Sequence, residues 1–388
     1  MKPDFDHINR REGTNSLKHD GKAGVFGADD VLPMWVADMD FAAPEAVTRA
    51  LEARAAHPVY GYTLVPESLY DALIGWMKKR HRWQIEREWI LLTPGVVPSL
   101  NVAVMALTRP GEGVIVQPPV YPPFFSAVSK TGRRLVENPL QCREGRYLMD
   151  FDNLEHCARN ARLLLLCSPH NPVGRVWQPE ELKTLLDIAR RHDLTILSDE
   201  IHADLVYPEF QHQALAALSA DPANIVTAVA PSKTFNIPGL GLSVLIVPDA
   251  RRRAEIAKVL DMIHVSVANP FSIAAFEAAY REGEPWLASL LAYLKQTRDV
   301  AASYIERELP EISLTKPEGT YLLWLDCRKI GMSDKELQRF FVHHAKVGMS
   351  PGATFGTGGN GCMRMNIGAP RQVVMTALQQ IRNALDIR

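Results

Sequence analysis

Short apolar runs of strand length alternate with helix-like segments through much of the chain. These runs stand at residues 89–92, 113–117, 162–167, 194–198 and 225–230. Strands that are apolar at successive positions are buried on both faces, so the alternation predicts a mostly parallel sheet covered by helices on both sides. A further run at 241–247 follows its predecessor too closely for a helical crossover and is expected to be antiparallel. The predicted fold class is α/β.

The length of 388 residues exceeds what one hydrophobic core usually holds, so more than one domain is expected. We predict an N-terminal segment at 1–45 that packs with the small domain, a large domain at 46–283 and a smaller α/β domain at 284–388. The last of these follows from a long helical pattern after residue 283 and from two later strands, each followed by a helical pattern.

Composition excludes several functional classes. A formal net charge of −1 gives no electrostatic reason to expect nucleic acid or an anionic membrane as a partner. The sequence contains no run of 18 apolar residues, so no membrane span is predicted. The first residues lack the apolar stretch of a secretory signal. The five cysteines form no C-x-x-C pair, which predicts neither a zinc site nor a disulfide framework. The expected compartment is the cytoplasm.

Ligands of open parallel sheets bind at the carboxyl ends of the strands, and polar or turn-forming residues gather at those ends here. Taken singly, each has an ordinary structural explanation such as a turn, a helix cap or a core position. Together they indicate one site, whose members are Gly95, Val96, Val97, Tyr121, Asn171, Asp199, His202, Ser232 and Lys233.

The chemistry of these residue types fits an aromatic aldehyde phosphate with a pyridine ring. A lysine just past a buried strand, such as Lys233, has a lowered pKa and can form a Schiff base with an aldehyde. Asp199 can keep a pyridine nitrogen protonated, Asn171 can donate to the ring oxygen and Tyr121 can stack on the ring. The phosphate is expected at the start of the helix opened by Gly95-Val96-Val97, assisted by the Ser232 hydroxyl.

Eight stretches carry a resemblance to a known family. In chain order they are WVADMDFAAPE, HPVYGYT, TPGVVPSLN, QPPVYPPF, SPHNPVGRVW, SDEIHADL, PSKTFNIPGL and PGATFG…RMNIGAPR. They cover nearly the whole chain. The sequence resembles the fold-type I pyridoxal-phosphate enzymes of the class I/II aminotransferase superfamily, and within it the MalY/PatB-type cystathionine β-lyases. The resemblance implies the aspartate aminotransferase-like fold.

The same resemblance implies roles for particular residues. Lys233 would be the cofactor lysine, Asp199 its pyridinium partner, and Arg364 the group that grips the substrate carboxylate. Residues Trp35 to Asp40 would lie near the substrate entrance. Tyr60 would reach the cofactor phosphate of a neighbouring subunit, which implies a homodimer with shared active sites.

Two departures from the aminotransferase pattern favour the lyase branch. Many aminotransferases carry a phosphate-binding arginine eight residues after the lysine, where this chain has Gly241, and many carry a tyrosine where this chain has His202. The predicted reaction is β-elimination of L-cystathionine or a related cysteine S-conjugate to a thiol, pyruvate and ammonia. Lys233 would take the α-proton, and Lys233 or Tyr121 would give a proton to the departing sulfur.

Two other functions stay open at this point. An aminotransferase needs the same residues and differs only in returning a proton to the cofactor. A regulatory protein that keeps the fold would act through protein contacts. A nucleotide-binding Rossmann enzyme is excluded because no G-x-G-x-x-G follows a strand.

Overall fold

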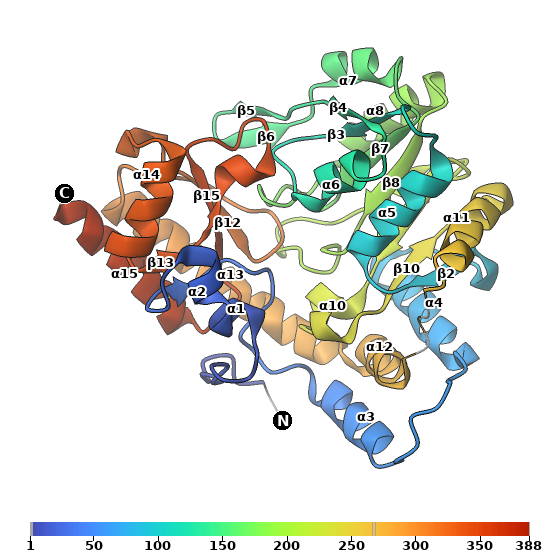
Figure 1. Ribbon diagram of the computed structural model, residues 1–388, viewed down its shortest axis with the longest axis horizontal. Helices are drawn as coiled ribbons and strands as arrows, with labels where there is room; N and C mark the ends of the chain where they lie inside the picture. The colour runs from blue at the N-terminus through green and yellow to red at the C-terminus, as the bar shows by residue number, and fades with distance from the viewer. Residues whose placement is uncertain (1–2, 266, 268, 388) are drawn as a thin grey trace.

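A seven-stranded sheet forms the centre of the larger part of the molecule (Figure 1). The computed structural model describes residues 3–265, 267 and 269–387. Across the sheet the strands are β2 (Ile90–Thr93), β10 (Ser243–Ile246), β9 (Ile225–Val229), β8 (Thr195–Asp199), β7 (Leu163–Cys167), β3 (Gly113–Val116) and β4 (Arg134–Glu137). Strands β9, β8, β7, β3 and β4 run parallel, while β10 is antiparallel to both neighbours. The α/β class and the antiparallel strand are confirmed.

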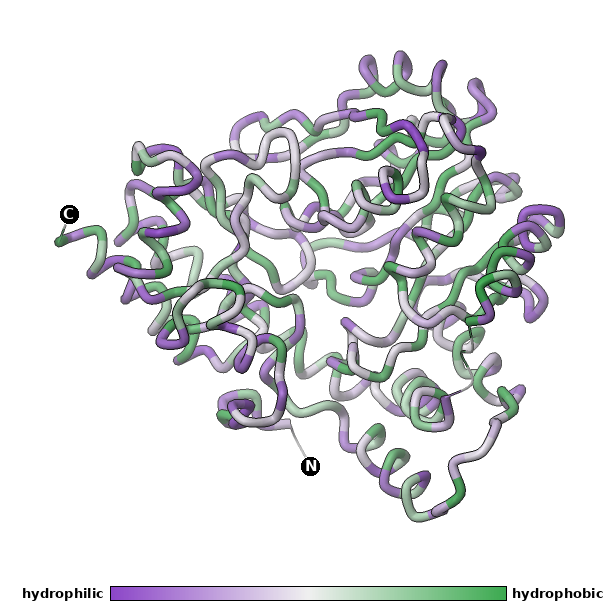
Figure 2. Tube along the Cα trace, viewed as in Figure 1, coloured by the Kyte–Doolittle hydropathy of each residue, from purple (hydrophilic) through white to green (hydrophobic). Residues whose placement is uncertain are grey.

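The strand sequences bury both faces of this sheet. Along β7, Leu163 and Leu165 pack into one hydrophobic cluster, and Leu164 and Leu166 pack into the other. Successive side chains of a strand point to opposite faces, so a run of leucines serves both clusters. Helices α5 (Val96–Leu107), α6 (Pro123–Ser129) and α11 (Ala250–Met262) supply one cluster, and α7 (Phe151–Ala158) and α8 (Pro179–Arg191) supply the other. Figure 2 shows that α7 and α11 turn hydrophilic residues outward.

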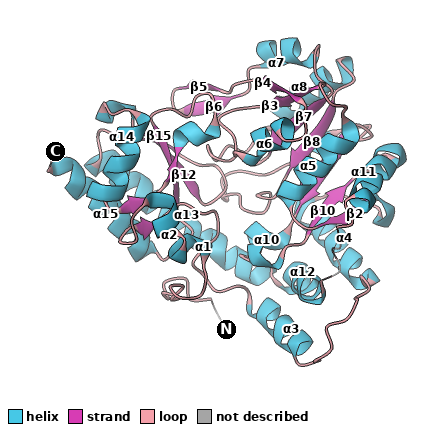
Figure 3. Cartoon of the chain, viewed as in Figure 1, coloured by secondary structure: helices cyan, strands magenta, loops and turns pink. Residues whose placement is uncertain are grey.

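The C-terminal part contains a four-stranded antiparallel sheet in the order β11 (Ser313–Thr315), β12 (Leu322–Asp326), β15 (Cys362–Asn366) and β14 (Ser350–Pro351). The long helix α13 (Glu284–Glu308) contacts α15 (Arg371–Asp386) beside this sheet (Figure 3). The predicted domain limits at residues 45 and 283 stay a prediction.

The N-terminal segment runs from the short helices α1 (Leu17–Asp20) and α2 (Lys22–Phe26) into β1 (Leu32–Pro33). Strand β1 pairs in parallel with β13 (Val347–Gly348) of the C-terminal part. The chain then leads through α3 (Glu45–Ala55) and an extended stretch to α4 (Glu67–His81), which contacts α12 (Pro270–Glu282). Within the described residues, no helix combines the length and the apolar character needed to cross a membrane.

One predicted helix differs in the structure. The helical pattern of residues 333–347 predicts a single helix, but α14 (Asp334–Arg339) passes into a π-helix at Phe340–His344. Phe340, Phe341 and Val342 are all buried. One face of a regular α-helix cannot bury three successive residues, and the wider π turn reorients them.

Candidate active site

A cavity of about 220 Å³ lies at the carboxyl ends of the central strands. It is lined by nine residues predicted from the sequence, namely Gly95, Val96, Val97, Tyr121, Asn171, Asp199, His202, Ser232 and Lys233. It is also lined by Ala37, Pro94, Pro98, Cys167, Ile201, Ala230, Pro238, Gly241 and Leu242. Cys167 and Ala230 stand at or just past strand ends, so the rule that located the first group would have located them as well.

Lys233 lies in the short helix α10 (Pro231–Thr234), directly after β9. Its Nζ donates a hydrogen bond of 2.6 Å to the main-chain oxygen of Ala37. Burial lowers the pKa of Lys233 to about 8; Arg364 contributes to this shift, and Asp38 and Asp199 oppose it. Near neutral pH the side chain therefore supplies a larger fraction of free amine than an exposed lysine.

Asp199 ends β8 and is buried between Cys167 of β7 and Ala228 of β9. Its Oδ1 accepts a hydrogen bond of 3.1 Å from the main-chain nitrogen of Ile201. Burial is the main cause that raises the pKa of Asp199 to about 7. A cation that enters the cavity beside Asp199 would stabilise the charged form of this buried carboxyl group.

His202 is buried in the turn that follows Asp199, and its Nδ1 has no hydrogen-bond partner. Burial lowers its pKa to about 3, and the positive charges of Lys233 and Arg364 act in the same direction. The ring is therefore neutral at physiological pH and keeps one nitrogen available to a ligand.

Arg364 projects from the centre of β15 and is buried. Its Nη1 donates to Asn171 Oδ1 at 3.0 Å, and its Nη2 donates to Trp35 O at 2.8 Å and to Ser350 Oγ at 3.2 Å. Its Nε has no partner. Burial lowers the pKa of Arg364 to about 10, so the guanidinium is still charged at neutral pH. These contacts join the C-terminal sheet to the cavity through Asn171.

Helix α5 begins at the cavity. Gly95, its N-cap residue, has φ 157° and ψ 158°, a region that is essentially reserved for glycine. No side chain caps the helix. The start of α5 therefore presents main-chain N–H groups to an anion, with Ser232 on the same cavity wall.

Three other predicted residues are placed differently from one another. Tyr121 lines the cavity, and burial raises the pKa of its hydroxyl. Trp35 does not line it: its Nε1 donates to Lys18 O at 3.1 Å. Tyr60 is exposed, and its hydroxyl donates to Ala55 O at 3.1 Å. The roles of Trp35 and Tyr60 in substrate or cofactor binding stay predictions.

The segment 35–38 is the part of the site that sequence reasoning assigned only loosely. Its carbonyl groups accept hydrogen bonds from Lys233, Arg364, Tyr321 and Asn366. These donors come from positions far apart in the chain. No local sequence pattern signals that Tyr321 and Asn366 reach this segment.

The residues of the cavity fit pyridoxal phosphate. A protonated ring nitrogen would stabilise the buried Asp199 carboxylate, and Lys233 supplies an amine for the aldehyde. The partnerless His202 Nδ1 and the uncapped start of α5 offer groups for the ring substituents and the phosphate. Among the described residues, no group of three or more His, Cys, Asp or Glu side chains could hold a metal ion.

Together, the seven-stranded sheet and the smaller C-terminal sheet define a protein of the aminotransferase fold. The solved structure of a pyridoxal-phosphate-bound putative aminotransferase from Clostridium difficile matches with a TM-score of 0.98 and 40% identity, covering 99% of this chain and 100% of the other. Residues 29–381 match the family described as aminotransferase class I and II. The chain belongs to that family.

Two further relatives are described by their chemistry. Cystathionine β-lyase PatB of Bacillus subtilis is 44% identical over 98% of this chain and 99% of its own length. The crystal structure of cystalysin from Treponema denticola, which contains a pyridoxal 5'-phosphate cofactor, matches with a TM-score of 0.97 and 36% identity over 100% of both chains.

Proposed function

We propose that this protein is a pyridoxal-phosphate-dependent carbon–sulfur β-lyase that acts on L-cystathionine or a related cysteine S-conjugate. The observation that carries the proposal is the cavity in which Lys233, with its lowered pKa, faces the buried carboxylate of Asp199, with Arg364 held beside it through Asn171. The similarity to PatB, whose name states this reaction, supports it over the full length of the chain.

Bound pyridoxal phosphate supplies an electron sink for the bond electrons released when the α-proton leaves the substrate. Arg364 would bind the substrate carboxylate through its charged guanidinium and so orient the α-carbon. Lys233 Nζ would take the α-proton and return a proton to the sulfur that leaves Cβ, with Tyr121 as the other candidate donor. The Asp199 carboxylate would keep the ring nitrogen protonated. The apolar lining of the cavity would limit the access of water.

Gly241 supports assignment to the lyase branch. It lines the cavity, and by the resemblance described above it stands where many aminotransferases carry a phosphate-binding arginine. Among the described residues that line the cavity there is no arginine that would pair with the side-chain carboxylate of a dicarboxylic amino acid.

The proposal includes a homodimer in which Tyr60 completes the site of the other subunit. Val59, Tyr60, Tyr62 and Leu64 are all exposed on the extended stretch between α3 and α4, and Leu64 is 90% exposed. Contiguous exposed apolar residues of this kind mark interaction surfaces. A cytoplasmic location is also part of the proposal, and the five free cysteines, four of them buried, support it.

An acceptor-free assay tests the reaction. Purified protein with pyridoxal phosphate and L-cystathionine, without any keto acid, should release pyruvate and free thiol in equal amounts over many turnovers. Lys233→Ala should abolish this release together with the visible absorption of the bound cofactor. If the substrate reacts only after a keto acid is added, and the amino group of the substrate is then found on that keto acid, the protein is an aminotransferase. A protein that turns over in neither assay would contradict both enzymatic functions.

A further inference from the structure

The main chain of residues 35–38 contacts both cationic side chains of the proposed site. Trp35 O accepts from Arg364 Nη2 at 2.8 Å. Ala37 O accepts from Lys233 Nζ at 2.6 Å and from the Tyr321 hydroxyl at 2.8 Å. The position of this short segment therefore determines where the hydrogen-bond acceptors of Lys233 and Arg364 lie.

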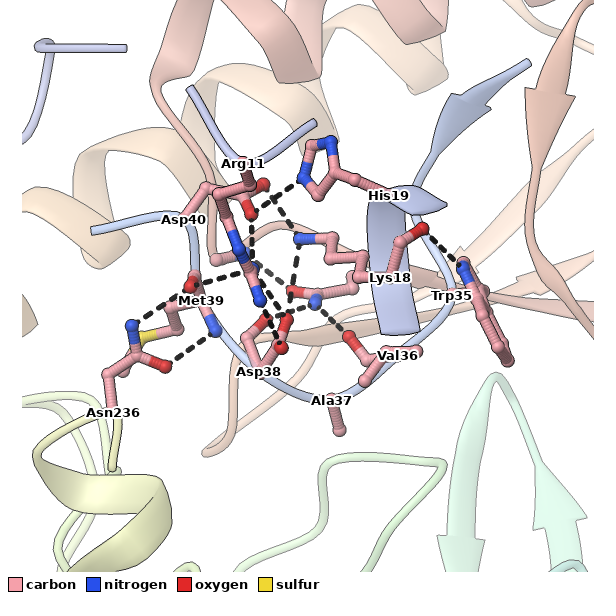
Figure 4. A network of polar contacts seen from close by, with 12 residues as sticks. Arg11, Lys18, His19, Trp35, Val36, Ala37, Asp38, Met39, Asp40 and Asn236 are labelled. Atoms are coloured by element: carbon pink, nitrogen blue, oxygen red, sulfur yellow. Dashed lines mark hydrogen bonds and ion pairs between the residues drawn. The ribbon is translucent and has the colours of Figure 1, made fainter. Parts of the chain in front are cut away.

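Two asparagines hold this segment and Met39, the residue that follows it. Asn366 Nδ2 donates to the carbonyl oxygens of Val36 and Asp38. Asn236, three residues after Lys233, accepts from Met39 N at 2.9 Å and donates to Met39 O at 2.9 Å (Figure 4). Both asparagines bond the main chain, so they fix its path and leave its carboxylate side chains to other partners.

Those carboxylates bind three basic residues of the N-terminal segment (Figure 4). Arg11 donates to both carboxylate oxygens of Asp38, at 3.0 and 2.7 Å, and to Asp40 Oδ1 at 2.7 Å. Lys18 Nζ donates to Asp40 Oδ2 at 2.7 Å, and His19 Nε2 lies 3.1 Å from Asp40 Oδ1. We call these five residues the N-terminal ion cluster.

The cluster is tightly constrained because most of it is buried. Lys18 is 0% exposed, and the side chain of Asp40 is 11% exposed. Burial alone would raise the pKa of Asp40, but hydrogen bonds from His19, Lys18 and Arg11 and the charge of Lys18 hold it well below its ordinary value. A buried ion pair that loses one partner leaves an uncompensated charge, so each member restrains the others.

We propose that the N-terminal ion cluster is a positioning element: it fixes segment 35–38 so that the Ala37 carbonyl receives the free amino group of Lys233 while the Trp35 carbonyl orients Arg364. The inference rests on the proposed function, since it assigns Lys233 and Arg364 the roles given above. Arg11, Lys18 and His19 act through the segment, and none of them lines the cavity.

Arg11→Met tests the inference on the cofactor-free protein. Arg11 is the most exposed of the three basic side chains, at 23%, and its loss removes the closest cation from Asp38. The measurement is the pH dependence of the rate at which the cofactor-free protein reacts with pyridoxal phosphate, because the midpoint reports the amine of Lys233. The groups that face this amine are Asp38, Asp199 and Arg364, with His202, Tyr121 and Tyr321 nearby.

The wild-type midpoint should lie near the Lys233 pKa of about 8. In Arg11→Met the segment is no longer fixed, so the Ala37 acceptor and the Asp38 carboxylate, which favour the charged form of Lys233, move away from the ammonium. The midpoint should fall by about half a unit or more, and the reaction at neutral pH should become roughly two- to threefold faster. The loaded variant should show a lower kcat together with a higher KM, because Lys233 and Arg364 both lose their alignment.

Arg190→Met is the matched control, because it breaks the exposed pair with Asp187 on α8 and should leave the midpoint unchanged. If Arg11→Met fails to fold, the same titration on Lys18→Arg, which keeps the charge but not the fit, should also give a lowered midpoint. An unchanged or raised midpoint in a folded variant would overturn the inference. Failure of the wild-type protein to react with pyridoxal phosphate would instead overturn the proposed function.

Discussion

Burial moves the pKa values of Lys233 and Asp199 in opposite directions, and both shifts favour the uncharged form. The two charges attract each other, but each alone loses more by leaving water. The charged forms of both side chains are therefore destabilised by burial. A ligand with a positive ring nitrogen would pair with Asp199, and an aldehyde would react with the free amine of Lys233.

Asp199→Asn should stabilise the cofactor-free protein, increasingly so at higher pH. Folding raises the pKa of Asp199 from its ordinary value to about 7, so the folded protein holds this proton more tightly than the unfolded chain. Between those two pKa values the wild-type protein loses stability as pH rises. Urea unfolding should show that the advantage of the variant grows by about 2 kcal/mol between about pH 5.5 and about pH 8.

The reference for this experiment is the same pair of proteins loaded with pyridoxal phosphate. The cofactor should reverse the order of stability, because only the wild-type carboxylate can pair with the ring nitrogen. A variant whose advantage does not change with pH would show that Asp199 carries no elevated pKa.

The sequence located Lys233, Asp199 and Asn171 because parallel strands deliver their last residues to one edge of a sheet. It could not locate the contacts of Ala37. The hydrogen bond from Lys233 to Ala37 spans 196 positions, and the one from Tyr321 spans 284. Such contacts depend on how the N-terminal segment packs against the C-terminal sheet. The local spacing of apolar residues in the sequence does not predict this packing.

At the scale of elements, strand and helix positions were predictable wherever burial was continuous. Strands β7, β8 and β9 are buried at every position, and their apolar runs were plain in the sequence. Strand β4 was not predicted, because it lies at the sheet edge and its first two residues are exposed. Strand β1 has two residues and exists only because β13 pairs with it.

The start of α5 gives a prediction at this scale. Gly95→Ala should destabilise the protein by about 1–3 kcal/mol, because its φ of 157° and ψ of 158° are strained for any residue with a Cβ. The added Cβ itself would meet only Pro98, at 3.5 Å. Relaxation of the turn would move the N–H groups of α5, so affinity for pyridoxal phosphate should fall as well.

Gly75→Ala is the matched control for the helix start. Gly75 is exposed within α4, and an added Cβ would meet nothing within 4 Å. This change should stabilise the protein by about 0.5–1 kcal/mol and leave cofactor affinity unchanged. Thermal unfolding and fluorescence titration with pyridoxal phosphate measure both quantities. Equal behaviour of the two variants would contradict the assignment of α5 as the phosphate site.

At the scale of the whole molecule, the predicted cofactor-binding residue Tyr60 does not line the cavity of a single chain. Tyr60 stands on the exposed stretch beyond α3, where its ring contacts Phe271 at a centroid distance of 5.6 Å. The residues that line the cavity lie between Ala37 and Leu242 in the sequence, and Tyr60, which falls in this range, points its hydroxyl back to Ala55 instead. The proposed dimer accounts for this placement if Tyr60 serves the partner's cavity.

Mixed dimers test whether the sites are shared. Tyr60→Ala and Lys233→Ala proteins should each be nearly inactive alone. When both chains are expressed together, half of the dimers are mixed, and each mixed dimer has one site with an intact Lys233 and an intact Tyr60 from the other chain. The mixture should therefore recover about a quarter of wild-type lyase activity.

The reciprocal mixture makes the experiment decisive. In a dimer of wild-type chain with the double variant Tyr60→Ala/Lys233→Ala, the intact Lys233 faces a partner that lacks Tyr60, and the intact Tyr60 faces a partner that lacks Lys233. Shared sites predict that purified mixed dimers of this kind are inactive. Sites built within one chain predict the reverse, namely activity in these dimers and none in the mixture of single variants. The two kinds of mixed dimer thus give opposite results according to which subunit Tyr60 serves. Differently tagged chains allow each mixed dimer to be isolated before the assay.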